Sequence, residues 1–506
     1  MAQQLSSINL VAPAFKGINT EDSPIAQDPS FADVADNAVI DKRGRIAARK
    51  GHNVLTTDKT ALGTASIKNI HEFKDSSGAK VILSVGNNKV MTGTTTLTDI
   101  TSGISISADN WKIVNFNDKA YFFQRGVQPL VYDGSSLSQL TGIASTQYGN
   151  EVISAYGRLW TADVGTNNKS IVYWSDLLIG NDWDGGTSGR IDVSKVWPDG
   201  YDEIVALAAH NGFLIIFGKH SIVAYQGAEA PATMSLSDTV AGVGCVDRDT
   251  VQYTGTDVIF LSHTGLRSFG RTIQEKSMPI STLSKTITKD IIKEIQGENT
   301  SFRSVYSPEE NFYLLSFVGR NTTFCFDLRG TLEDGSYRVT RWPQSVFTAY
   351  ERLEDGTLHI GSTEGISTYS GYQDNGQSYR FKYYSPSLTF GDPSKLKFIK
   401  KIKPTIIGSS NATAFIKLAY DFSETYKNVT FTIPQATTVA EFNVNEFGAN
   451  SSPLSQFSGE SKQIVRKGLN GSGSGSTVVV GLESDINGSE LSLQEINILA
   501  LLGKTI

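Results

Sequence analysis

The sequence predicts an all-β protein: a β-propeller of about six to seven blades with one inserted helix, followed by a C-terminal β-sandwich. Three observations predict this arrangement. A strand–turn–strand unit recurs along the chain as far as Gly371, one helical stretch interrupts the recurrence, and longer strands follow it. The composition agrees, because 47 glycines and 10% aromatic residues with only 14 prolines suit many short strands joined by Gly and Asn turns.

The recurring unit is plainest in "HNGFLIIFGKHSIVAYQG", residues 210–227, where two apolar runs are separated by a Gly turn and end near an aromatic residue. The starts of the units lie roughly 40 to 55 residues apart, which is the length of one four-stranded propeller blade. Seven units are found, at 70–93, 111–134, 152–176, 203–227, 250–271, 304–330 and 346–371.

The inner strands of these units read as buried on both faces. Runs such as Val258-Ile259-Phe260-Leu261 show little apolar–polar alternation, as expected for blades stacked face to face. Turn pairs such as Asn211-Gly212 tolerate the positive φ that tight hairpins require. The alternative is a β-sandwich with an independent barrel. In a propeller, a strand from the N-terminal segment is expected to close the first or last blade, because this removes an exposed edge.

One stretch, residues 281–298, has helical rather than strand periodicity. Its apolar residues recur at helical spacing and Gly297 stands where a helix would end; the apolar residues are Leu283, Ile287, Ile291 and Ile295. We expect an amphipathic helix inserted between the fifth and sixth units. It would contact a neighbour on one propeller face or, alternatively, plug one end of the central channel.

After Gly371 the strands become longer, which predicts an antiparallel sandwich. The expected division is an N-terminal entry segment packing on the propeller (1–60), the propeller with a helical insertion near 281–297 (61–371) and the sandwich (372–506). The strands are expected at 379–390, 395–407, 413–421, 428–433, 462–467, 476–482 and 491–502, with looser stretches at 447–460 and 468–476.

Composition and motifs argue against several functional classes. No apolar stretch is long enough to span a membrane, the N-terminus lacks the pattern of a secretory signal, and the net charge of −6 gives no general reason to bind nucleic acid. Cys245 and Cys325 have no partnering spacing. The six histidines are scattered, and hydrolase elbow, phosphate-loop and dinucleotide motifs are missing. We therefore expect no catalytic, cofactor-binding or metal-binding residues.

An acidic cluster offers the best alternative to that expectation. Asp176, Asp182 and Asp184 could bind Ca²⁺ from an irregular loop, but they lack the ordered spacing of a calcium loop, and Asp-Gly turns are common between blade strands. Glycosidase chemistry would need a positioned acid and nucleophile, and no spacing here identifies such a pair.

Two basic runs stand out, one at 41–51 and one at 395–403. In the second, lysines alternate with apolar residues, with one break in phase near Ile399, which predicts a strand with a lysine face. That face would contact a neighbouring subunit or ring, would face DNA phosphates, or would guard a solvated edge strand. The candidate contact residues are Lys395, Lys397, Lys400, Lys401 and Lys403.

Four segments together resemble the packaged-DNA stabilisation and tail nozzle (tail tubular) proteins of short-tailed bacteriophages. Residues 15–51 have a Gly-Ile-Asn start and a basic Gly-x-x-x-x-Arg-x-Gly close, and residues 171–227 are similar to the family's central stretch. "MPISTLSKTITKDIIKEI" (278–295) resembles its helical insertion, and "SLTFGDPSKLKFIKKIKP" (387–404) resembles the strand that opens its sandwich.

The resemblance implies a structural virion protein and no enzyme. It implies a ring, expected to be hexameric, below the portal and adaptor, assembled in the host cytoplasm and contacting the head-to-tail connector and a tail fibre or needle. Double-stranded DNA would pass without sequence specificity along an acidic or neutral lining, since strong phosphate binding would stall ejection. The alternatives are a glycan-cleaving propeller, which needs convergent carboxylates and an arginine cluster at the propeller centre, and a glycan-binding surface protein.

Overall fold

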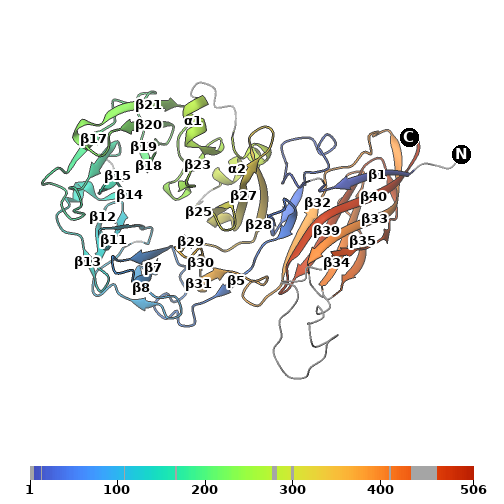
Figure 1. The fold of residues 1–506 in the computed structure, drawn as a ribbon, viewed down its shortest axis with the longest axis horizontal. Helices are drawn as coiled ribbons and strands as arrows, with labels where there is room; N and C mark the ends of the chain where they lie inside the picture. Colours follow the sequence, from blue (N-terminus) through green and yellow to red (C-terminus); the bar gives the residue numbers. More distant parts are fainter. Residues whose placement is uncertain are drawn as a thin grey trace, which may run out of the picture.

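The computed structural model describes most of the chain, and its residues form a propeller and a pair of packed sheets (Figure 1). The residues described are 5–12, 14–107, 109–165, 168–275, 282–297, 301–408, 412–434 and 464–505. The predicted stretch at 447–460 lies outside them. The fold class is the predicted one, all-β with a propeller and additional C-terminal sheets.

Six separate sheets form blades, and part of a larger sheet takes one further place in the ring. The first three blades are β6 (Asn69–Lys74), β7 (Lys80–Gly86), β8 (Lys89–Thr92) and β9 (Thr98–Asp99); β10 (Lys112–Phe116), β11 (Lys119–Gln124), β12 (Val127–Tyr132) and β13 (Leu137–Gln139); and β14 (Gly149–Ala155), β15 (Arg158–Val164), β16 (Ile171–Trp174) and β17 (Gly189–Asp192). Each of these three blades contains one of the recurring sequence units, with a fourth strand added.

The remaining blades complete the ring, because their first strands follow one another until β29 lies beside β6. They are β18 (Ile204–His210), β19 (Phe213–Gly218), β20 (Ser221–Gln226) and β21 (Ser235–Ala241); β22 (Gln252–Tyr253), β23 (Val258–Ser262) and β24 (Gly265–Ser268); β25 (Phe302–Ser307), β26 (Phe312–Phe317), β27 (Thr322–Thr331) and β28 (Tyr337–Pro343); and β29 (Ala349–Arg352), β30 (Leu358–Ser362), β31 (Gly365–Tyr369) and β5 (His52–Val54). Since β5 pairs with β31, the N-terminal segment closes the last blade, as predicted.

Neighbouring blades share apolar cores, which explains the continuous apolar runs in the sequence. In β19, Leu214 and Ile216 pack against the third blade, while Ile215 and Phe217 pack against the fifth. Successive side chains of a strand point to opposite faces, so a strand between two blades must be apolar at every position. Full burial of each such side chain contributes about 1.5–3 kcal/mol.

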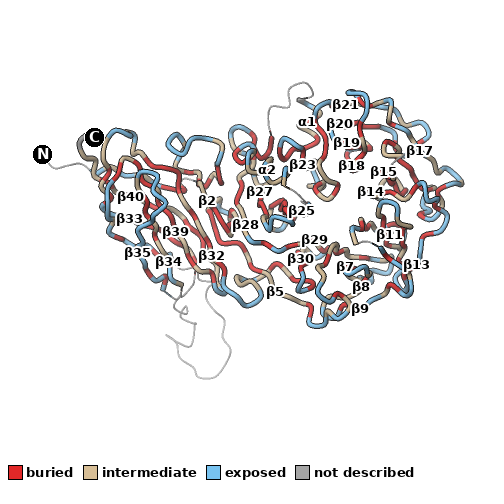
Figure 2. The backbone as a smooth tube through the Cα atoms, turned by 180° about the vertical axis from the view of Figure 1, so that it is seen from behind, coloured by how far each residue is buried: buried red, intermediate tan, exposed pale blue. Residues whose placement is uncertain are grey.

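The sixth blade continues into the sandwich through a three-residue strand. β2 (Val34–Asp36) pairs with β28 in parallel and with β32 (Tyr379–Tyr384) antiparallel, which makes one nine-stranded sheet. This sheet continues through β39 (Val478–Ile486), β34 (Ala412–Tyr420) and β35 (Lys427–Ile433). Figure 2 shows buried residues recurring along β28, β2 and β32, where the propeller meets the sandwich. One apolar core joins residues of the fifth and sixth blades to the sandwich.

The second sheet of the sandwich is built around two long strands from the C-terminal part of the chain. Its strands are β3 (Ala38–Ile40), β4 (Ile46–Ala48), β40 (Leu491–Thr505), β33 (Lys395–Gly408) and β36 (Ile464–Arg466), with β1 (Leu5–Leu10) on β40 and β37 (Leu469–Asn470) and β38 (Ser474–Gly475) on β33. The strands expected from the sequence after Gly371 are therefore found at nearly the expected positions.

Two α-helices lie beside the fifth and sixth blades. α1 (Phe269–Glu275) follows β24 and packs on β23, and α2 (Thr288–Ile295) is the predicted insertion. Ile287 and Ile291 are buried in the core shared with the sandwich, and the Thr20 hydroxyl donates to Asp290 at 2.8 Å. α2 therefore contacts the N-terminal segment, on the side facing the sandwich, instead of closing the channel (Figure 1).

Short 3-10 helices complete the described elements, at η1 (Ser145–Gln147), η2 (Pro231–Thr233), η3 (Arg248–Thr250), η4 (Lys285–Ile287) and η5 (Val318–Arg320). Neither α-helix is long and apolar enough to cross a membrane, and the same holds for every helix in the part of the chain that the structure describes.

Candidate functional site at the propeller axis

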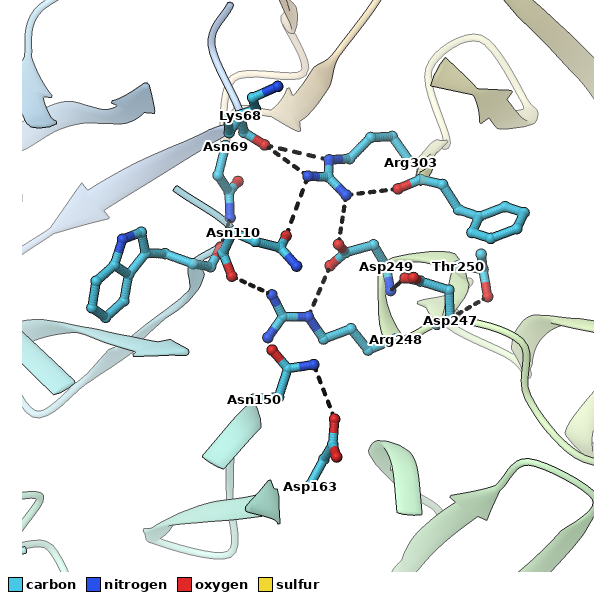
Figure 3. Close-up of polar contacts among 12 residues, drawn as sticks. Lys68, Asn69, Asn110, Asn150, Asp163, Asp247, Arg248, Asp249, Thr250 and Arg303 are labelled. Carbon is cyan, nitrogen blue, oxygen red and sulfur yellow. Dashed lines mark hydrogen bonds and ion pairs between the residues drawn. The ribbon is translucent and has the colours of Figure 1, made fainter. Parts of the chain in front are cut away.

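Polar residues from several blades converge at one end of the propeller axis (Figure 3). Apart from Asp163, near the end of β15, they come from the connections that lead into the first strand of a blade, or from its first residues. The labelled residues are Lys68, Asn69, Asn110, Asn150, Asp163, Asp247, Arg248, Asp249, Thr250 and Arg303. The side chains of Arg248, Asp249 and Arg303 form a row between the blades.

The centre of the row is held by η3. Asp247 is its N-cap, and its carboxylate accepts the backbone N–H of Asp249 at 2.8 Å, while the Thr250 hydroxyl donates to the Asp247 carbonyl at 2.7 Å. This capping fixes the short turn, so that Arg248 and Asp249 are held in place at the axis. The local sequence Asp-Arg-Asp-Thr thus fixes the turn that places the Arg248 guanidinium beside the Asp249 carboxylate.

Arg303, at the start of β25, links the sixth blade to its neighbours. Its Nη1 donates to Asp249 Oδ2 at 2.7 Å, its Nη2 to the Lys68 carbonyl at 3.2 Å and its Nε to the Thr348 carbonyl at 3.1 Å. Burial would raise the pKa of the Asp249 carboxyl, but Arg303 and Arg248 outweigh burial and hold that pKa below its usual value. Asp249 is therefore an ionised anchor for both arginines.

Arg248 is more deeply buried and less completely paired than Arg303. Its side chain keeps 3% of its exposure; Nη2 donates to the Asn110 carbonyl at 2.6 Å, and Nε lies 3.7 Å from Asp249 Oδ1. Nη1 is buried and has no hydrogen-bond partner among the described residues. A buried guanidinium with unused donors is uncommon, because each unmet donor loses its hydration without replacement.

Two small polar cavities flank this row. One of about 180 Å³ is lined by Asn110, Arg125, Asn150, Asp163, Lys169, Glu203, Ile204, Val205, Lys219, Val246, Asp247 and Arg248. The other, of about 130 Å³, is lined by Asn69, Ile70, His71, Lys112, Ile113, Asp249, Gln252, Arg303, Ser304, Tyr350 and Glu351. Both have the size and polarity for a small hydrophilic ligand or for water.

A buried carboxyl, Glu151 on β14, lies near the row. The residue is 1% exposed, and its Oε2 has no hydrogen-bond partner among the described residues. Burial raises the pKa of Glu151 to about 7, against the opposing effects of Lys112 and Arg248. Burial likewise raises the pKa of Asp247 to about 6. The axis thus holds carboxyl groups that exchange protons near neutral pH, which could serve either binding or acid–base chemistry.

The described residues include no group of three or more His, Cys, Asp or Glu that could hold a metal ion. The acidic cluster of the sequence instead shapes the loop before β17. Asp176 accepts the backbone N–H of Thr187 at 2.8 Å and its hydroxyl at 2.6 Å, and Asp182 accepts Gly185 N–H at 2.8 Å. These hydrogen bonds lower the pKa of Asp176, so the carboxylate is used within its own loop.

The lysine strand is β33, and its lysines do not form one continuous face. Lys400, Lys401 and Lys403 are exposed, and Lys395 pairs with Asp392 at 2.9 Å. Lys397, in contrast, is fully buried: its ammonium group donates to the carbonyls of Asp392 and Ser476, and burial lowers its pKa.

β33 is paired on both sides, with β40 and with β36–β38, so it is not the guarded edge strand considered above. The pairing register shifts between Ile399 and Lys401, where the sequence pattern breaks phase. The surface available for a contact is therefore limited to the three exposed lysines and their surroundings.

Sequence reasoning missed the axial residues because they are distributed over several blades, and most blades contribute only one or two of them. A signal was nevertheless present, since Asn69, Asn110, Asp249 and Arg303 each stand directly before a recurring unit. Aligning the units and examining the position before each start would have selected these residues.

Comparisons with known proteins give similarity in fold only. No family model and no curated protein matches the chain. Among solved structures, it is similar to the computationally designed Ika8 protein (12% identity, TM-score 0.36, 64% of this chain and 100% of that one). It is also similar to the WD40 domain of Neurospora crassa Pan2, with 9% identity and a TM-score of 0.36 over 64% of this chain and 94% of that one. A third similar structure is the extracellular domain of the hybrid two component system BT4673 from B. thetaiotaomicron, with 11% identity and a TM-score of 0.42 over 85% of this chain and 61% of that one.

Proposed function

We propose that the chain is a structural subunit of a ring, expected to be hexameric, in the tail nozzle of a short-tailed bacteriophage. The ring would extend the conduit for packaged DNA and help to retain and deliver the genome. The observation that supports this role best is the joining of propeller and sandwich into one sheet and one core. A ring subunit that contains DNA under pressure has to resist bending between its parts.

The segment between propeller and sandwich is also fixed by a buried ion pair. Arg49 donates to both carboxylate oxygens of Asp374, at 2.8 and 2.6 Å, and its guanidinium lies 4.2 Å from the ring centre of Tyr379. The Arg49 side chain keeps 6% of its exposure. Directional bonds of this kind fix the orientation of two packed parts, which apolar contacts alone leave less defined.

In this proposal the DNA passes through the space enclosed by the subunits. The propeller's own axis carries Arg248, Asp249 and Arg303. Lys400, Lys401 and Lys403 would contact an acidic surface of a neighbouring subunit or ring, such as the head-to-tail connector, and such a contact weakens as salt increases. The chain would have no hydrolytic activity.

The proposal is tested by mass photometry and negative-stain imaging of the purified chain, alone and with the connector protein encoded beside it. We expect closed rings, and we expect the K400Q/K401Q/K403Q variant to lose ring or connector contacts. A variant with Lys74, Lys80 and Lys89 of the first blade changed to Gln loses the same charge and should assemble normally. A chain that stays monomeric under all these conditions contradicts the proposal.

The second candidate is a propeller that binds or cleaves surface glycans. It is favoured by the convergence of Glu151, Asp247 and Asp249 with Arg248 and Arg303, since carboxylates and arginines at the propeller centre are what such a site requires. Release of reducing sugar from capsular or envelope polysaccharide, abolished in E151Q and D247N, would establish it. If the folded wild-type chain releases no reducing sugar, the cleavage candidate is contradicted and the structural role remains the proposal.

A further inference from the structure

We propose that the 180 Å³ cavity at the propeller axis binds a small oxyanion, a carboxylate or a phosphate, through the guanidinium of Arg248. The inference does not depend on ring formation. It begins with the unused donors of this side chain: guanidinium has five N–H donors, and the described contacts of Arg248 use Nη2 and, weakly, Nε. Arg248 lines the cavity, and its Nη1 is buried without a protein acceptor in the described part of the chain.

The other cations of the cavity already have partners. Arg125 pairs with Asp163, which also accepts the Asn150 side chain at 3.0 Å. Lys169 and Lys219 share Glu203, at 2.8 and 2.6 Å.

The carboxylate nearest to Arg248 along the row is also engaged. Asp249 is held at 2.7 Å by Arg303, whereas its distance to Arg248 Nε is 3.7 Å. Among the described residues that line the cavity, Arg248 is thus the deeply buried cation with a donor that lacks an acceptor, and an oxyanion would supply that acceptor.

The side chains that line the cavity differ widely in exposure. Arg125 and Lys219 keep about half of their side-chain exposure, 47% and 51%, whereas Arg248 keeps 3% and Asp163 6%. The exposed cations therefore form a rim and Arg248 lies at the floor. Positive charge at the rim attracts an anion, and a partly desolvated guanidinium at the floor forms stronger hydrogen bonds than it would in water.

Two carboxyl groups near Arg248 make the binding dependent on pH. Glu151 and Asp247 lie close enough to interact with Arg248 electrostatically, and the other charged groups around them are Lys112, Asp249 and Arg303. When these carboxyls are protonated they cease to repel an anion. For a carboxylate ligand, which stays ionised throughout this range, binding is therefore expected to be tighter at pH 6 than at pH 8, with a smaller difference in E151Q.

The test is calorimetric titration of the full chain at pH 6 with sodium phosphate, with sodium glucuronate and with neutral glucose as a control ligand. We expect saturable binding of at least one anion and none of glucose. Tighter phosphate binding assigns the site to phosphate groups, and tighter glucuronate binding assigns it to acidic sugars. The R248K variant keeps the charge but loses the paired donors, and we expect its affinity to fall about tenfold or more.

Two further variants make the result decisive. R248M should show no saturable binding, and R190M, which removes an exposed arginine on β17, should bind like wild type. If R248M does not fold, as judged by circular dichroism, R248K alone decides. The proposal is overturned if neither anion binds saturably, or if R248K binds both as tightly as wild type. Ring assembly is measured separately, so that failure of one proposal leaves the other standing.

Discussion

The interface between the fourth and fifth blades and the interface between the sixth blade and the sandwich are built from different groups. In the first, Phe217 packs against Phe260 with ring centres 4.8 Å apart, inside a cluster of apolar side chains. In the second, Arg341 pairs with Asp36 at 2.8 Å, and the Thr340 hydroxyl and the Trp342 indole N–H both donate to the Ala38 carbonyl. The repeated interface relies on buried area, whereas the single interface to the sandwich adds directional bonds.

The difference follows from how each interface is specified. Between blades, the same geometry recurs around the ring, and complementary apolar faces are enough to stack one blade on the next. Between propeller and sandwich, the N-terminal segment forms an interface that occurs only once among the described residues, with β2 paired to a strand on each side. Gly17 of this segment, with φ of +92°, approaches the backbone so closely that a Cβ would lie 2.6 Å from Val339 N. Such a contact needs defined partners at each position.

The largest effect is expected from Phe217→Ala in the repeated interface. Removing a fully buried phenyl ring leaves a cavity between two blades, and the free energy of unfolding should fall by about 3–5 kcal/mol. Urea unfolding followed by tryptophan fluorescence measures the change. Leu236→Ala on β21, where the side chain is 44% exposed, is the control and should change stability by less than about 0.5 kcal/mol. Equal effects of the two variants would show that the blade cores are not the main source of stability.

Arg49→Met should have the next largest effect, about 2–3 kcal/mol, because it leaves the Asp374 carboxylate without its charged donors. Unlike Phe217→Ala, it should also loosen the connection to the sandwich, so that limited proteolysis cuts between residues 370 and 378. Arg190→Met is the matched control, since this arginine is exposed. Unchanged proteolysis would mean that the shared sheet alone fixes the two parts.

Acid should weaken the same connection. Hydrogen bonds from Arg49 and His52 overcome the effect of burial and lower the pKa of Asp374 to about 2. A depressed carboxyl pKa stabilises the fold above the ordinary value near 4, and the contribution, about 2 kcal/mol, is lost as pH falls from there through 2. Urea midpoints measured from pH 5 to pH 2 should drop less steeply for Asp374→Asn than for wild type. Identical slopes would contradict this assignment.

Thr340→Val should have the smallest effect. It removes the hydroxyl that donates to the Ala38 carbonyl at 2.6 Å, while the Trp342 donor remains, so a loss of about 1 kcal/mol is expected. Thermal unfolding is sensitive enough to measure it. A loss as large as that of Phe217→Ala would mean that directional bonds outweigh apolar burial in this molecule.

The parts of the fold that could be predicted are those whose sequence pattern either recurs along the chain or has a regular period. Every blade contains one recurring unit, the closing strand β5 follows from the need to remove an edge, and α2 follows from its helical spacing. β2 could not be predicted, because three residues carry no periodicity and their partners are distant in sequence. The burial of Lys397 could not be predicted for a similar reason, because one of the carbonyls that accept its hydrogen bonds belongs to Ser476, which is distant in sequence.

The axial site was harder to predict than the blades. Its residues belong to separate connections, and no local spacing relates Arg248 to Asn110 or to Arg303. Only the ring brings them together, so the site is a property of the closed propeller. The acidic cluster at Asp176 and Asp182 shows the reverse case, in which carboxylates accept hydrogen bonds from residues that are close in sequence and so shape their own loop.

The path of the first 54 residues has a consequence for how the chain folds during synthesis. β1 and β4 pair with β40, β2 joins two sheets and β5 closes the propeller, so these strands depend on partners that lie much later in the chain. At ribosomal rates, roughly 25 to 100 seconds separate β1 from β40, and the other strands wait a shorter time for their partners. For that time the N-terminal strands have exposed edges, and a chaperone or a neighbouring chain could pair with them first.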